Sequence, residues 1–413
     1  MTADSGITPA LAGRSLMEGS EALARASIVA GCRFFAGYPM TPFTEVLEHF
    51  ARLLPDVGGT CVNAESELEA VGMAWGACAT GARAATGSTG QGLSLMQESL
   101  SEATLAEIPL VVFNMARSQG DYFQATRGGG HGDYRHLVLA PEDVREGIVL
   151  TQLAFHLADK WRNPVLVYGD YLLAHTQEAV SIDVVDFGSL PDKDWAVDGS
   201  RTGSGVSGNV TPLGVGKFGQ RQFGQEGKAQ YIASKIPLME RETLVETGYL
   251  DDAETVVVAF GTPAKFVKYA VAQLREAGHR IGYVRPITLW PFPYETVHDA
   301  AAGARAVGSF ELSAGQLVDD VRIGVAGQAP VEHLGGISTD HSGFGVGRLL
   351  DVDEVTSRVL ALHEGRPQPP VPGYEEFSYE LAPHQESPTP QRFGVTNWRN
   401  TAVTDARTTG VRT

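Results

Sequence analysis

Two short segments of the chain, residues 37–42 and 64–67, carry the residue types best suited to chemistry. They read Gly-Tyr-Pro-Met-Thr-Pro and Ala-Glu-Ser-Glu, and each follows a predicted strand and opens a predicted helix. In an open α/β sheet such turns lie together at the carboxyl edge, where ligands bind. The carboxylate of Glu67 could therefore act on a bound cofactor. A helix dipole alone also favours negative charge at this position, by about 0.3–1 kcal/mol, so both interpretations stay open.

Two further residues next to predicted strand ends could contact a ligand. Thr41 lies between Pro39 and Pro42, which stiffen the turn, and its hydroxyl could either cap the following helix or bind a ligand. Arg117 directly follows an apolar predicted strand at 109–115. Its guanidinium could form a bidentate pair with a carboxylate, or it could be an ordinary surface arginine.

Two glycine-rich segments add weaker signals. Residues 87–92, which include Gly90, precede a predicted helix, so their backbone N–H groups form either an anion site or a tight turn. Residues 124–135 contain three consecutive glycines between Arg127 and His131. This pattern is typical of a mobile or a closely approached loop, and its charged and aromatic residues resemble a gate of a ligand site. A single loop histidine is more often a bystander than a catalyst, and no metal site is predicted here.

Composition limits the classes of partner. The chain has 413 residues and a formal net charge of −17, which disfavours binding to nucleic acid or to an anionic membrane. The three cysteines, Cys32, Cys61 and Cys78, form no Cys-x-x-Cys pair, so we expect neither structural zinc nor an iron–sulfur cluster on this chain. So few cysteines fit a reducing cytoplasm. We see no signal peptide and no apolar stretch that could cross a bilayer.

The alternation of strands and helices predicts α/β architecture with two doubly wound parallel-sheet domains, at residues 14–185 and 250–366. In the first domain we expect strands at 32–36, 60–63, 82–86, 109–115 and 164–168, and helices at 17–30, 43–54, 67–80, 93–106 and 141–160. In the second we expect strands at 255–260, 280–285, 306–311 and 330–334, and helices at 263–277 and 315–323. Residues 186–249 form a linker or crossing segment, and residues 367–413 form an extended tail.

Six stretches of the chain together resemble one known family. The chain is similar to the α subunit of thiamine-diphosphate-dependent 2-oxoacid:ferredoxin oxidoreductases, most closely the 2-oxoisovalerate (branched-chain) type. The resemblance covers residues 14 to about 180 and 250 to about 340. The matching stretches are 31–42, 64–67, 93–98, 121–135, 285–293 and 311–316.

This resemblance assigns roles to the residues named above. The first domain would be a thiamine-diphosphate pyrimidine-binding domain, and the second would be similar to a transketolase C-terminal domain. Glu67 would contact the aminopyrimidine ring and promote the tautomer that ionises the thiazolium carbon. Thr41 would donate a hydrogen bond to the 2-oxoacid, and Arg117 would pair with its carboxylate. Further cofactor and loop contacts would come from Pro39, Gly90, Arg127 and His131.

The resemblance also implies partner chains, because the Gly-Asp-Gly…Asn motif that holds magnesium and the diphosphate does not occur in this sequence. In the family that motif lies on a β subunit, together with a [4Fe-4S] cluster, and γ and ferredoxin-like δ subunits are further chains. Thiamine diphosphate would be shared between the α and β subunits. Coenzyme A would be the co-substrate and ferredoxin the electron acceptor. The chain alone should then be inactive.

The reaction implied is CoA-dependent oxidative decarboxylation of a 2-oxoacid to an acyl-CoA. A branched-chain acid is favoured, with 2-oxoglutarate and pyruvate as alternatives. Arg117 runs directly into Ser-Gln-Gly, without the Gly/Pro-rich insertion usual in relatives, and residues 89–92 read Thr-Gly-Gln-Gly where many relatives have Ser-Pro-Gly. Both differences fall near the expected pocket. The alternatives are a non-oxidative thiamine-dependent decarboxylase or carboligase, and a non-catalytic scaffold subunit.

Overall fold

The computed structural model describes residues 13–197, 199, 210, 217–218, 221–222, 225–336 and 350–370. The chain divides into one compact unit, residues 1–371, and a second unit, residues 372–413. The predicted extended tail lies outside the described residues from residue 371 onward.

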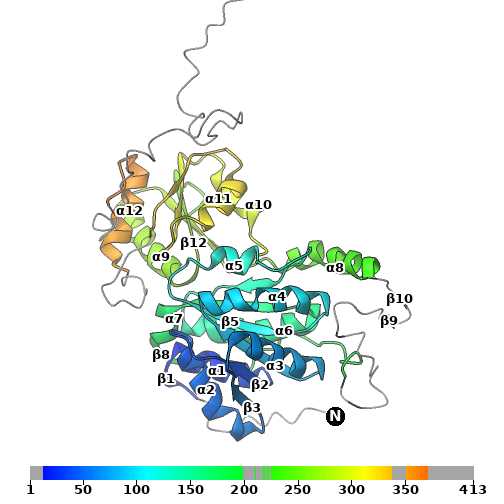
Figure 1. The fold of residues 1–413 in the computed structure, drawn as a ribbon. Helices are drawn as coiled ribbons and strands as arrows, with labels where there is room; N and C mark the ends of the chain where they lie inside the picture. The colour runs from blue at the N-terminus through cyan, green and yellow to red at the C-terminus, as the bar shows by residue number, and fades with distance from the viewer. Residues whose placement is uncertain are drawn as a thin grey trace, which may run out of the picture. The chain divides into compact units, whose positions relative to one another are not determined.

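A seven-stranded sheet forms the core of the first half of the chain (Figure 1). Its strand order is β14-β6-β7-β5-β4-β2-β3. Six of its strands pair in parallel. They are β2 (Cys32–Gly37), β3 (Thr60–Asn63), β4 (Arg83–Ser88), β5 (Val111–Ala116), β6 (Leu137–Leu139) and β7 (Val165–Asp170). An antiparallel ribbon of β1 (Ser15–Glu18) and β8 (Gln177–Val180) lies outside this sheet.

Helices cover both faces of this sheet, as the burial of all six residues of β5 requires. Val111 and Phe113 pack in one apolar cluster with α1 (Gly19–Val29), α2 (Thr44–Leu53) and α6 (Val144–Trp161). Val112 packs in another cluster with α3 (Glu67–Ala79) and α4 (Gly90–Leu105). Two short helices complete this half, α5 (Tyr122–Thr126) and α7 (Tyr171–His175), together with the 3-10 turn η2 (Pro55–Val57).

The second sheet has five strands in the order β11-β13-β12-β15-β16. The strands are β11 (Val245–Gly248), β12 (Thr255–Ala259), β13 (Ile281–Pro286), β15 (Ala306–Phe310) and β16 (Val331–His333), and only β11 pairs antiparallel. The helices are α9 (Gly261–Glu276) and α12 (Val352–Glu364) on one face, and α10 (Tyr294–Ala301) and α11 (Leu317–Val325) on the other. The predicted fold class, two parallel-sheet α/β domains, is confirmed.

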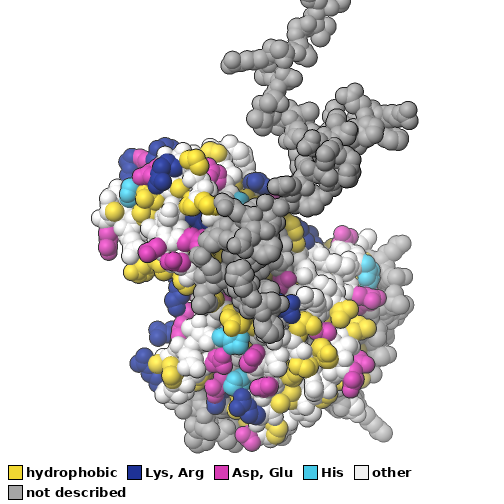
Figure 2. Space-filling view, turned by 60° about the vertical axis from the view of Figure 1, so that its left-hand side comes forward, with side chains coloured by type: hydrophobic (Ala, Val, Ile, Leu, Met, Phe, Trp, Pro, Cys, Tyr) yellow, Lys and Arg dark blue, Asp and Glu magenta, His cyan; other side chains and the backbone are white. Residues whose placement is uncertain are grey.

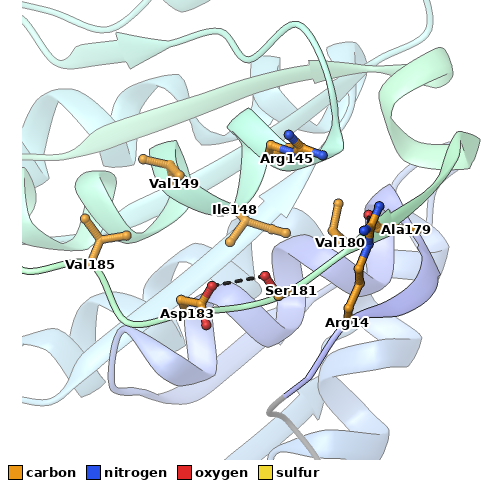
Figure 3. A pocket seen from close by; sticks show the side chains of 9 residues that line it. All are labelled: Arg14, Arg145, Ile148, Val149, Ala179, Val180, Ser181, Asp183 and Val185. Atoms are coloured by element: carbon orange, nitrogen blue, oxygen red, sulfur yellow. Dashed lines mark hydrogen bonds between the residues drawn. The ribbon is translucent and has the colours of Figure 1, made fainter.

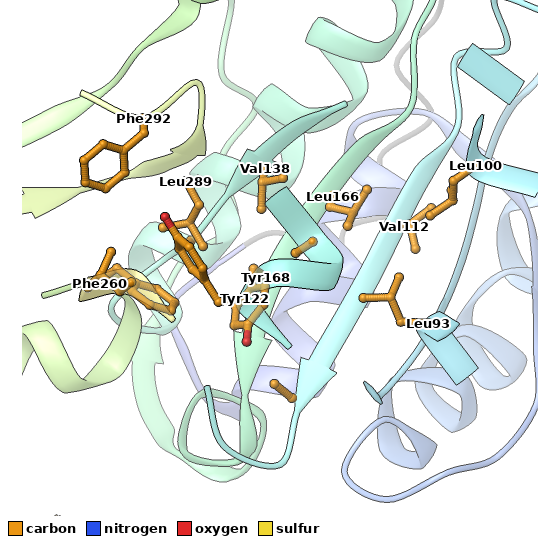
Figure 4. Packing of buried hydrophobic residues seen from close by; sticks show 14 of the residues in the cluster. Leu93, Leu100, Val112, Tyr122, Val138, Leu166, Tyr168, Phe260, Leu289 and Phe292 are labelled. Carbon is orange, nitrogen blue, oxygen red and sulfur yellow. The ribbon is translucent and has the colours of Figure 1, made fainter. Parts of the chain in front are cut away.

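One apolar cluster runs without a break from the first sheet to the second. Figure 4 shows Tyr122 and Tyr168 beside Phe260. The ring centroid of Phe260 lies 5.5 Å from that of Tyr122 and 5.6 Å from that of Tyr168. Burial of this aromatic surface couples the two sheets.

Three features differ from the sequence expectations. Helix α6 begins at Val144 and not at Pro141, because Asp143 is its N-cap and accepts a hydrogen bond from the Glu146 N–H at 2.9 Å. Strand β14 (Thr288–Trp290) pairs with β6 of the first sheet, although it follows β13 of the second. The predicted linker contains the short strands β9 (Lys217–Phe218) and β10 (Arg221–Gln222), helix α8 (Gln225–Met239) and the turn η4 (Glu240–Glu242).

Helix α8 is held against the first half of the chain by a buried ion pair. The Lys235 ammonium lies 3.0 Å from the Glu107 carboxylate, and both residues are at least nine-tenths buried. Ile232 and Met239 are buried on the same helix. Apolar burial and this ion pair explain a helix in a segment that the sequence predicted only as a linker or crossing segment.

Acidic and basic side chains are interspersed on the face drawn in Figure 2, without one continuous basic patch. Among the described residues, no helix combines the length and apolar character that crossing a bilayer requires.

A buried arginine links the two sheets through three carboxylates. Arg285 on β13 is 3% exposed and forms a bidentate pair with Glu146 of α6 at 2.8 Å. Its Nε donates to Glu246 of β11 at 2.7 Å, and Glu142 lies 3.5 Å away. Burial alone would raise the pKa of Glu246, but Lys268, Tyr283 and Arg285 together lower it. The arginine therefore neutralises a cluster of carboxylates at the junction of the two sheets.

We expect Arg285→Met to destabilise the folded chain by about 3–5 kcal/mol, because the substitution removes a buried guanidinium and leaves the Glu146 carboxylate without its bidentate partner. Urea unfolding of the purified protein measures this loss. The control is Arg322→Met, which removes an exposed pair with Asp319 and should cost less than about 1 kcal/mol. Equal losses in the two variants would contradict the importance of the Arg285 network.

Candidate active site

Four strand-to-helix turns meet at one edge of the first sheet. Strands β3, β2, β4 and β5 are neighbours in that order and run parallel. Their carboxyl ends therefore lie side by side. The turns after β3, β2, β4 and β5 contain Glu67, Thr41, Thr89 and Arg117, respectively. The sequence prediction that the 37–42 and 64–67 turns share one edge follows directly from this strand order.

Glu67 is buried at this edge, although it is an ionisable residue at the first position of α3. It is 2% exposed, and its Oε1 accepts a hydrogen bond from the Ser88 hydroxyl at 2.9 Å. The N-terminus of α3 is capped by Ser66, whose hydroxyl accepts from the Glu69 N–H at 3.3 Å. Because Ser66 already caps α3, capping does not explain why Glu67 is buried.

A glycine of α4 makes room for this carboxylate. A Cβ added at Gly92 would overlap both the Ser88 hydroxyl and the carboxylate of Glu67. Glycine at this position therefore lets α3 and α4 approach closely enough to enclose Glu67. The segment 87–92, which the sequence offered as an anion site or a tight turn, contributes Ser88 and Gly92 to the Glu67 environment.

Thr41 and Arg117 come together from different turns. The Arg117 Nε donates to the backbone carbonyl of Thr41 at 3.2 Å. Helix α2 begins at Thr44 after Phe43, with no side-chain cap, so the Thr41 hydroxyl does not cap it. Both Pro39 and Thr41 are exposed. Their exposure leaves this turn accessible to a ligand.

A cavity of about 360 Å³ opens beside Arg117 at the N-terminus of α4. It is lined by Thr89, Gly90, Gln91, Ser94, Arg117, Ser118, Asp121 and Gln124. The Thr89 hydroxyl is buried and has no hydrogen-bond partner among the described residues. The wall of the cavity therefore includes a buried hydroxyl without a partner among the described residues, next to an arginine.

Asp121 is a residue of this cavity that the sequence did not single out. Its Oδ2 accepts from the Asn114 amide and its Oδ1 from the Gln124 amide, each at 3.3 Å. Burial raises the pKa of Asp121, and Asn114, Arg117 and the Gly90 N–H offset part of that rise. The sequence signal for Asp121 was its position four residues after Arg117, in the segment that directly follows the buried strand β5.

The segment that carries these residues is anchored to the second half of the chain. The Gln119 amide donates to the Phe260 carbonyl at 3.0 Å and accepts from the Leu312 N–H at 2.9 Å. The Tyr122 hydroxyl donates to the buried carboxylate of Asp320 at 2.7 Å. Residues that directly follow β12 and β15, together with Asp320 of α11, thus fix the position of the loop that follows Arg117.

Arg127 and His131 do not line the cavity. Arg127 pairs with Asp320 at 3.1 Å, and His131 pairs with Glu102 of α4 at 2.8 Å. The glycines between them donate to the Tyr134 hydroxyl, from Gly129 at 3.1 Å and from Gly130 at 3.0 Å. The loop is therefore tied down by its own tyrosine in this structure.

A second cavity, of about 430 Å³, lies between α6 and the chain segment 179–185, which contains the end of β8 and the residues after it (Figure 3). Figure 3 shows Ile148, Val149 and Val185 along it, with Arg14 and Arg145 at one side. None of the residues that the sequence marked for chemistry lines it. The smaller cavity beside Arg117 is therefore the candidate active site.

The described residues contain no group of three or more His, Cys, Asp or Glu side chains that could hold a metal ion. Burial raises the pKa of the Cys32 and Cys78 thiols to about 12 and that of Cys61 to about 11. Thiols with such pKa values stay protonated and are poor nucleophiles.

The sequence matches two protein families. Residues 25–195 match "Pyruvate flavodoxin/ferredoxin oxidoreductase, thiamine diP-bdg", a thiamine-diphosphate-binding domain, and residues 253–342 match "Pyruvate:ferredoxin oxidoreductase core domain II". The chain is 38% identical over 318 residues to ketoisovalerate oxidoreductase subunit VorB of Methanothermobacter marburgensis, covering 75% of this chain and 89% of that protein. It is 34% identical over 378 residues to 2-oxoglutarate synthase subunit KorA of the same organism, covering 84% and 98%.

Two solved structures share the fold. One is the 2-oxoglutarate:ferredoxin oxidoreductase from Magnetococcus marinus with 2-oxoglutarate, coenzyme A and succinyl-CoA bound, with a TM-score of 0.69 and 24% identity. The match covers 85% of this chain and 65% of that one. The other is a split-gene transketolase in an inactive β4 tetramer, with a TM-score of 0.51, 14% identity, and coverage of 84% and 98%.

Proposed function

The chain belongs to the 2-oxoacid:ferredoxin oxidoreductase family, and we propose that it is the α subunit that supplies the pyrimidine side of a thiamine-diphosphate site. The observation that carries this proposal is the buried carboxylate of Glu67, enclosed by Ser88 and Gly92. In this role Glu67 holds and releases a proton at a ring nitrogen of the cofactor. Acid–base help of this kind is typically worth about 10²–10⁴ in rate.

The residues at the sheet edge fit the cofactor. Oε1 of Glu67 is occupied by Ser88, and among the described residues no group hydrogen-bonds to Oε2. A carboxylate that is nearly dry and has a free oxygen suits a ring nitrogen better than it suits solvent. Pro39 and Gly90 provide further contacts from the neighbouring turns. Thiamine diphosphate, when bound, supplies the carbanion chemistry, and the protein supplies orientation and a dry site.

Thr41 and Arg117 position the 2-oxoacid in this proposal. Arg117 lies on the cavity wall with its Nε directed to the Thr41 carbonyl, which leaves the remaining guanidinium donors for a substrate carboxylate. The Thr41 hydroxyl, free of any capping role in α2, donates to the substrate. Arg127 and His131 are assigned to the loop that borders the site.

A partner β subunit completes the site in this proposal. It carries the magnesium and diphosphate site and a [4Fe-4S] cluster, while γ and ferredoxin-like δ chains bring electrons to ferredoxin. The surface of α3 and α4 supports such a partner. Leu68, Met73 and Leu95 are exposed there, and beyond their own helix no described residue lies within 4 Å of a Cβ added at Gly72 or Gly76. Exposed apolar residues of this kind mark interaction surfaces.

The substrate we propose is a branched-chain 2-oxoacid, oxidised with coenzyme A to an acyl-CoA. The 38% identity to a ketoisovalerate oxidoreductase subunit supports this choice, and 2-oxoglutarate and pyruvate are the alternatives. The non-oxidative and scaffold alternatives have no structural observation in their favour.

The test is viologen reduction by the chain purified together with its β partner. Thiamine diphosphate, magnesium and coenzyme A are supplied, and 2-oxoisovalerate, 2-oxoglutarate and pyruvate are compared. We expect reduction with 2-oxoisovalerate, and none by the chain alone. Cofactor binding without viologen reduction by any acid would favour a non-oxidative thiamine enzyme. Cofactor binding that does not require this chain would favour a scaffold.

A further inference from the structure

A buried glutamine ties the loop after β5 to the second sheet. Gln119 is 1% exposed, and its side-chain amide donates to the Phe260 carbonyl at 3.0 Å and accepts from the Leu312 N–H at 2.9 Å. The backbone N–H of Gln119 also donates to the Leu312 carbonyl at 3.0 Å. Because Phe260 and Leu312 follow the neighbouring strands β12 and β15, these hydrogen bonds reach the carboxyl edge of the second sheet.

A second glutamine holds the same loop from the second half of the chain. Gln316 is the N-cap residue of α11. Its side-chain amide donates to the Gly120 carbonyl at 2.6 Å and accepts from the Phe123 N–H at 2.7 Å. Gln119 and Gln316 therefore form a reciprocal clamp, in which each half of the chain binds backbone groups of the other half with a glutamine amide.

The clamp fixes the backbone beside Arg117. Arg117 directly follows β5, so its backbone is set by the first sheet on one side and by Gln119 on the other. Among the described residues, the Arg117 side chain makes one direct hydrogen bond, from Nε to the Thr41 carbonyl at 3.2 Å. A long side chain with so few contacts loses conformational entropy when it is held in one geometry. The direction of the guanidinium therefore depends on the backbone that carries it.

We infer that Gln119 and Gln316 are positioning residues, which hold Arg117 in the orientation that pairs with the substrate carboxylate. The inference rests on the proposed function, in which Arg117 binds the carboxylate of a 2-oxoacid. Neither glutamine lines the cavity, so the second sheet acts on substrate binding through the loop. Hydrogen bonds in a dry junction are stronger than in water, and a displacement of about 1 Å at a binding group can cost about 10²-fold in rate.

The test measures KM and kcat of the chain purified together with its β partner. The substrate is whichever of 2-oxoisovalerate, 2-oxoglutarate and pyruvate the wild-type complex oxidises fastest. Gln119→Met and Gln316→Met keep a side chain of similar length but remove the amide hydrogen bonds. We expect each variant to raise KM by about tenfold and to keep kcat within about twofold of the wild type, because pairing with the carboxylate contributes to ground-state and transition-state binding alike.

A double-mutant cycle separates positioning from general structural damage. If the clamp acts through Arg117, then Gln119→Met should change kcat/KM by less than about twofold in the Arg117→Met background. A structural role would instead lower kcat/KM by the same factor in both backgrounds. Equal factors would therefore overturn the inference and leave the proposed function intact.

Gln152→Met is the matched control. Gln152 is also buried, and its amide bridges two backbone groups outside the Arg117 cavity, donating to the Asp183 carbonyl at 2.9 Å and accepting from the Val185 N–H at 3.0 Å. Its loss should leave KM unchanged. Hydrogen exchange of residues 117–123, measured by mass spectrometry on the complex, should become faster in both clamp variants and stay unchanged in the control.

The remaining results each decide between two readings. An unchanged KM in both clamp variants overturns the positioning role, whether or not exchange becomes faster, and leaves the proposed function intact. A KM raised equally by Gln152→Met also overturns it, because the loss of any buried amide bridge would then suffice. A complex that binds thiamine diphosphate but oxidises no 2-oxoacid overturns the proposed function, and the inference with it. Gln316 is less buried than Gln119, so Gln316→Met carries the test if Gln119→Met does not assemble.

Discussion

Replacing Glu67 with glutamine is expected to lower turnover of the assembled complex by about 10²–10⁴-fold. The amide is nearly isosteric with the carboxylate and can still accept a hydrogen bond from Ser88, which now binds Oε1 at 2.9 Å. It cannot take up and release a proton at the cofactor. Turnover is measured by viologen reduction at saturating 2-oxoacid. Assembly is followed by size-exclusion chromatography, and cofactor binding by calorimetry.

The matched control for this variant is Glu65→Gln, which removes a carboxylate two residues earlier at the same helix start. Glu65 is exposed, and its N–H donates to Glu69 at 3.0 Å. The control should retain wild-type turnover, since its side chain does not enter the enclosed space around Ser88 and Gly92. Wild-type turnover in Glu67→Gln would show that Glu67 has a structural role only.

The second large effect is expected from Arg117→Met, which should reduce kcat/KM for the 2-oxoacid by about 10–150-fold. Hydrogen bonds to charged groups contribute about 1.5–3 kcal/mol, and each 1.4 kcal/mol corresponds to a factor of ten. Arg117→Lys should recover part of the loss, because lysine restores the charge but not the planar fork of donors. Steady-state kinetics over a range of 2-oxoacid concentrations measure both variants.

Arg145→Met is the control for the loss of an arginine, because Arg145 lines the larger cavity between α6 and the segment after β8. Its kinetic constants should equal those of the wild type. A loss of activity in Arg145→Met, together with normal activity in Arg117→Met, would move the candidate site from the sheet edge to the larger cavity.

Local signals in the sequence predicted the elements that present the site. Strand β3 lies at Thr60–Asn63 and α3 begins at Glu67, both as expected from a short strand followed by a helix start with acidic residues. These signals succeed because strand alternation and helix capping depend on residues only a few positions apart. The parallel pairing of the strands in the first sheet was also expected from the regular alternation of strands and helices.

Long-range contacts explain the elements that the sequence did not predict. Strand β14 joins the first sheet only because β6 offers it an edge from about 150 positions earlier in the chain. Helix α8 is stabilised by the Lys235–Glu107 pair, whose members are 128 residues apart. The glycine-rich loop at 128–130 suggested a mobile gate, whereas Tyr134 satisfies its N–H groups. A local sequence pattern does not indicate contacts between residues that lie so far apart in the chain.

The sequence by itself determined which residue types stand at the strand ends, and therefore which chemistry the chain can carry. Glu67, Thr41 and Arg117 were identified from local pattern and family resemblance. Only the tertiary structure decided that Glu67 is dry beside Ser88 and Gly92, and that Asp121 faces the cavity with Arg117. Burial and facing charge depend on how β4, α4 and the loop after β5 pack together. They are set by the sum of contacts between distant residues, which a one-dimensional pattern does not contain.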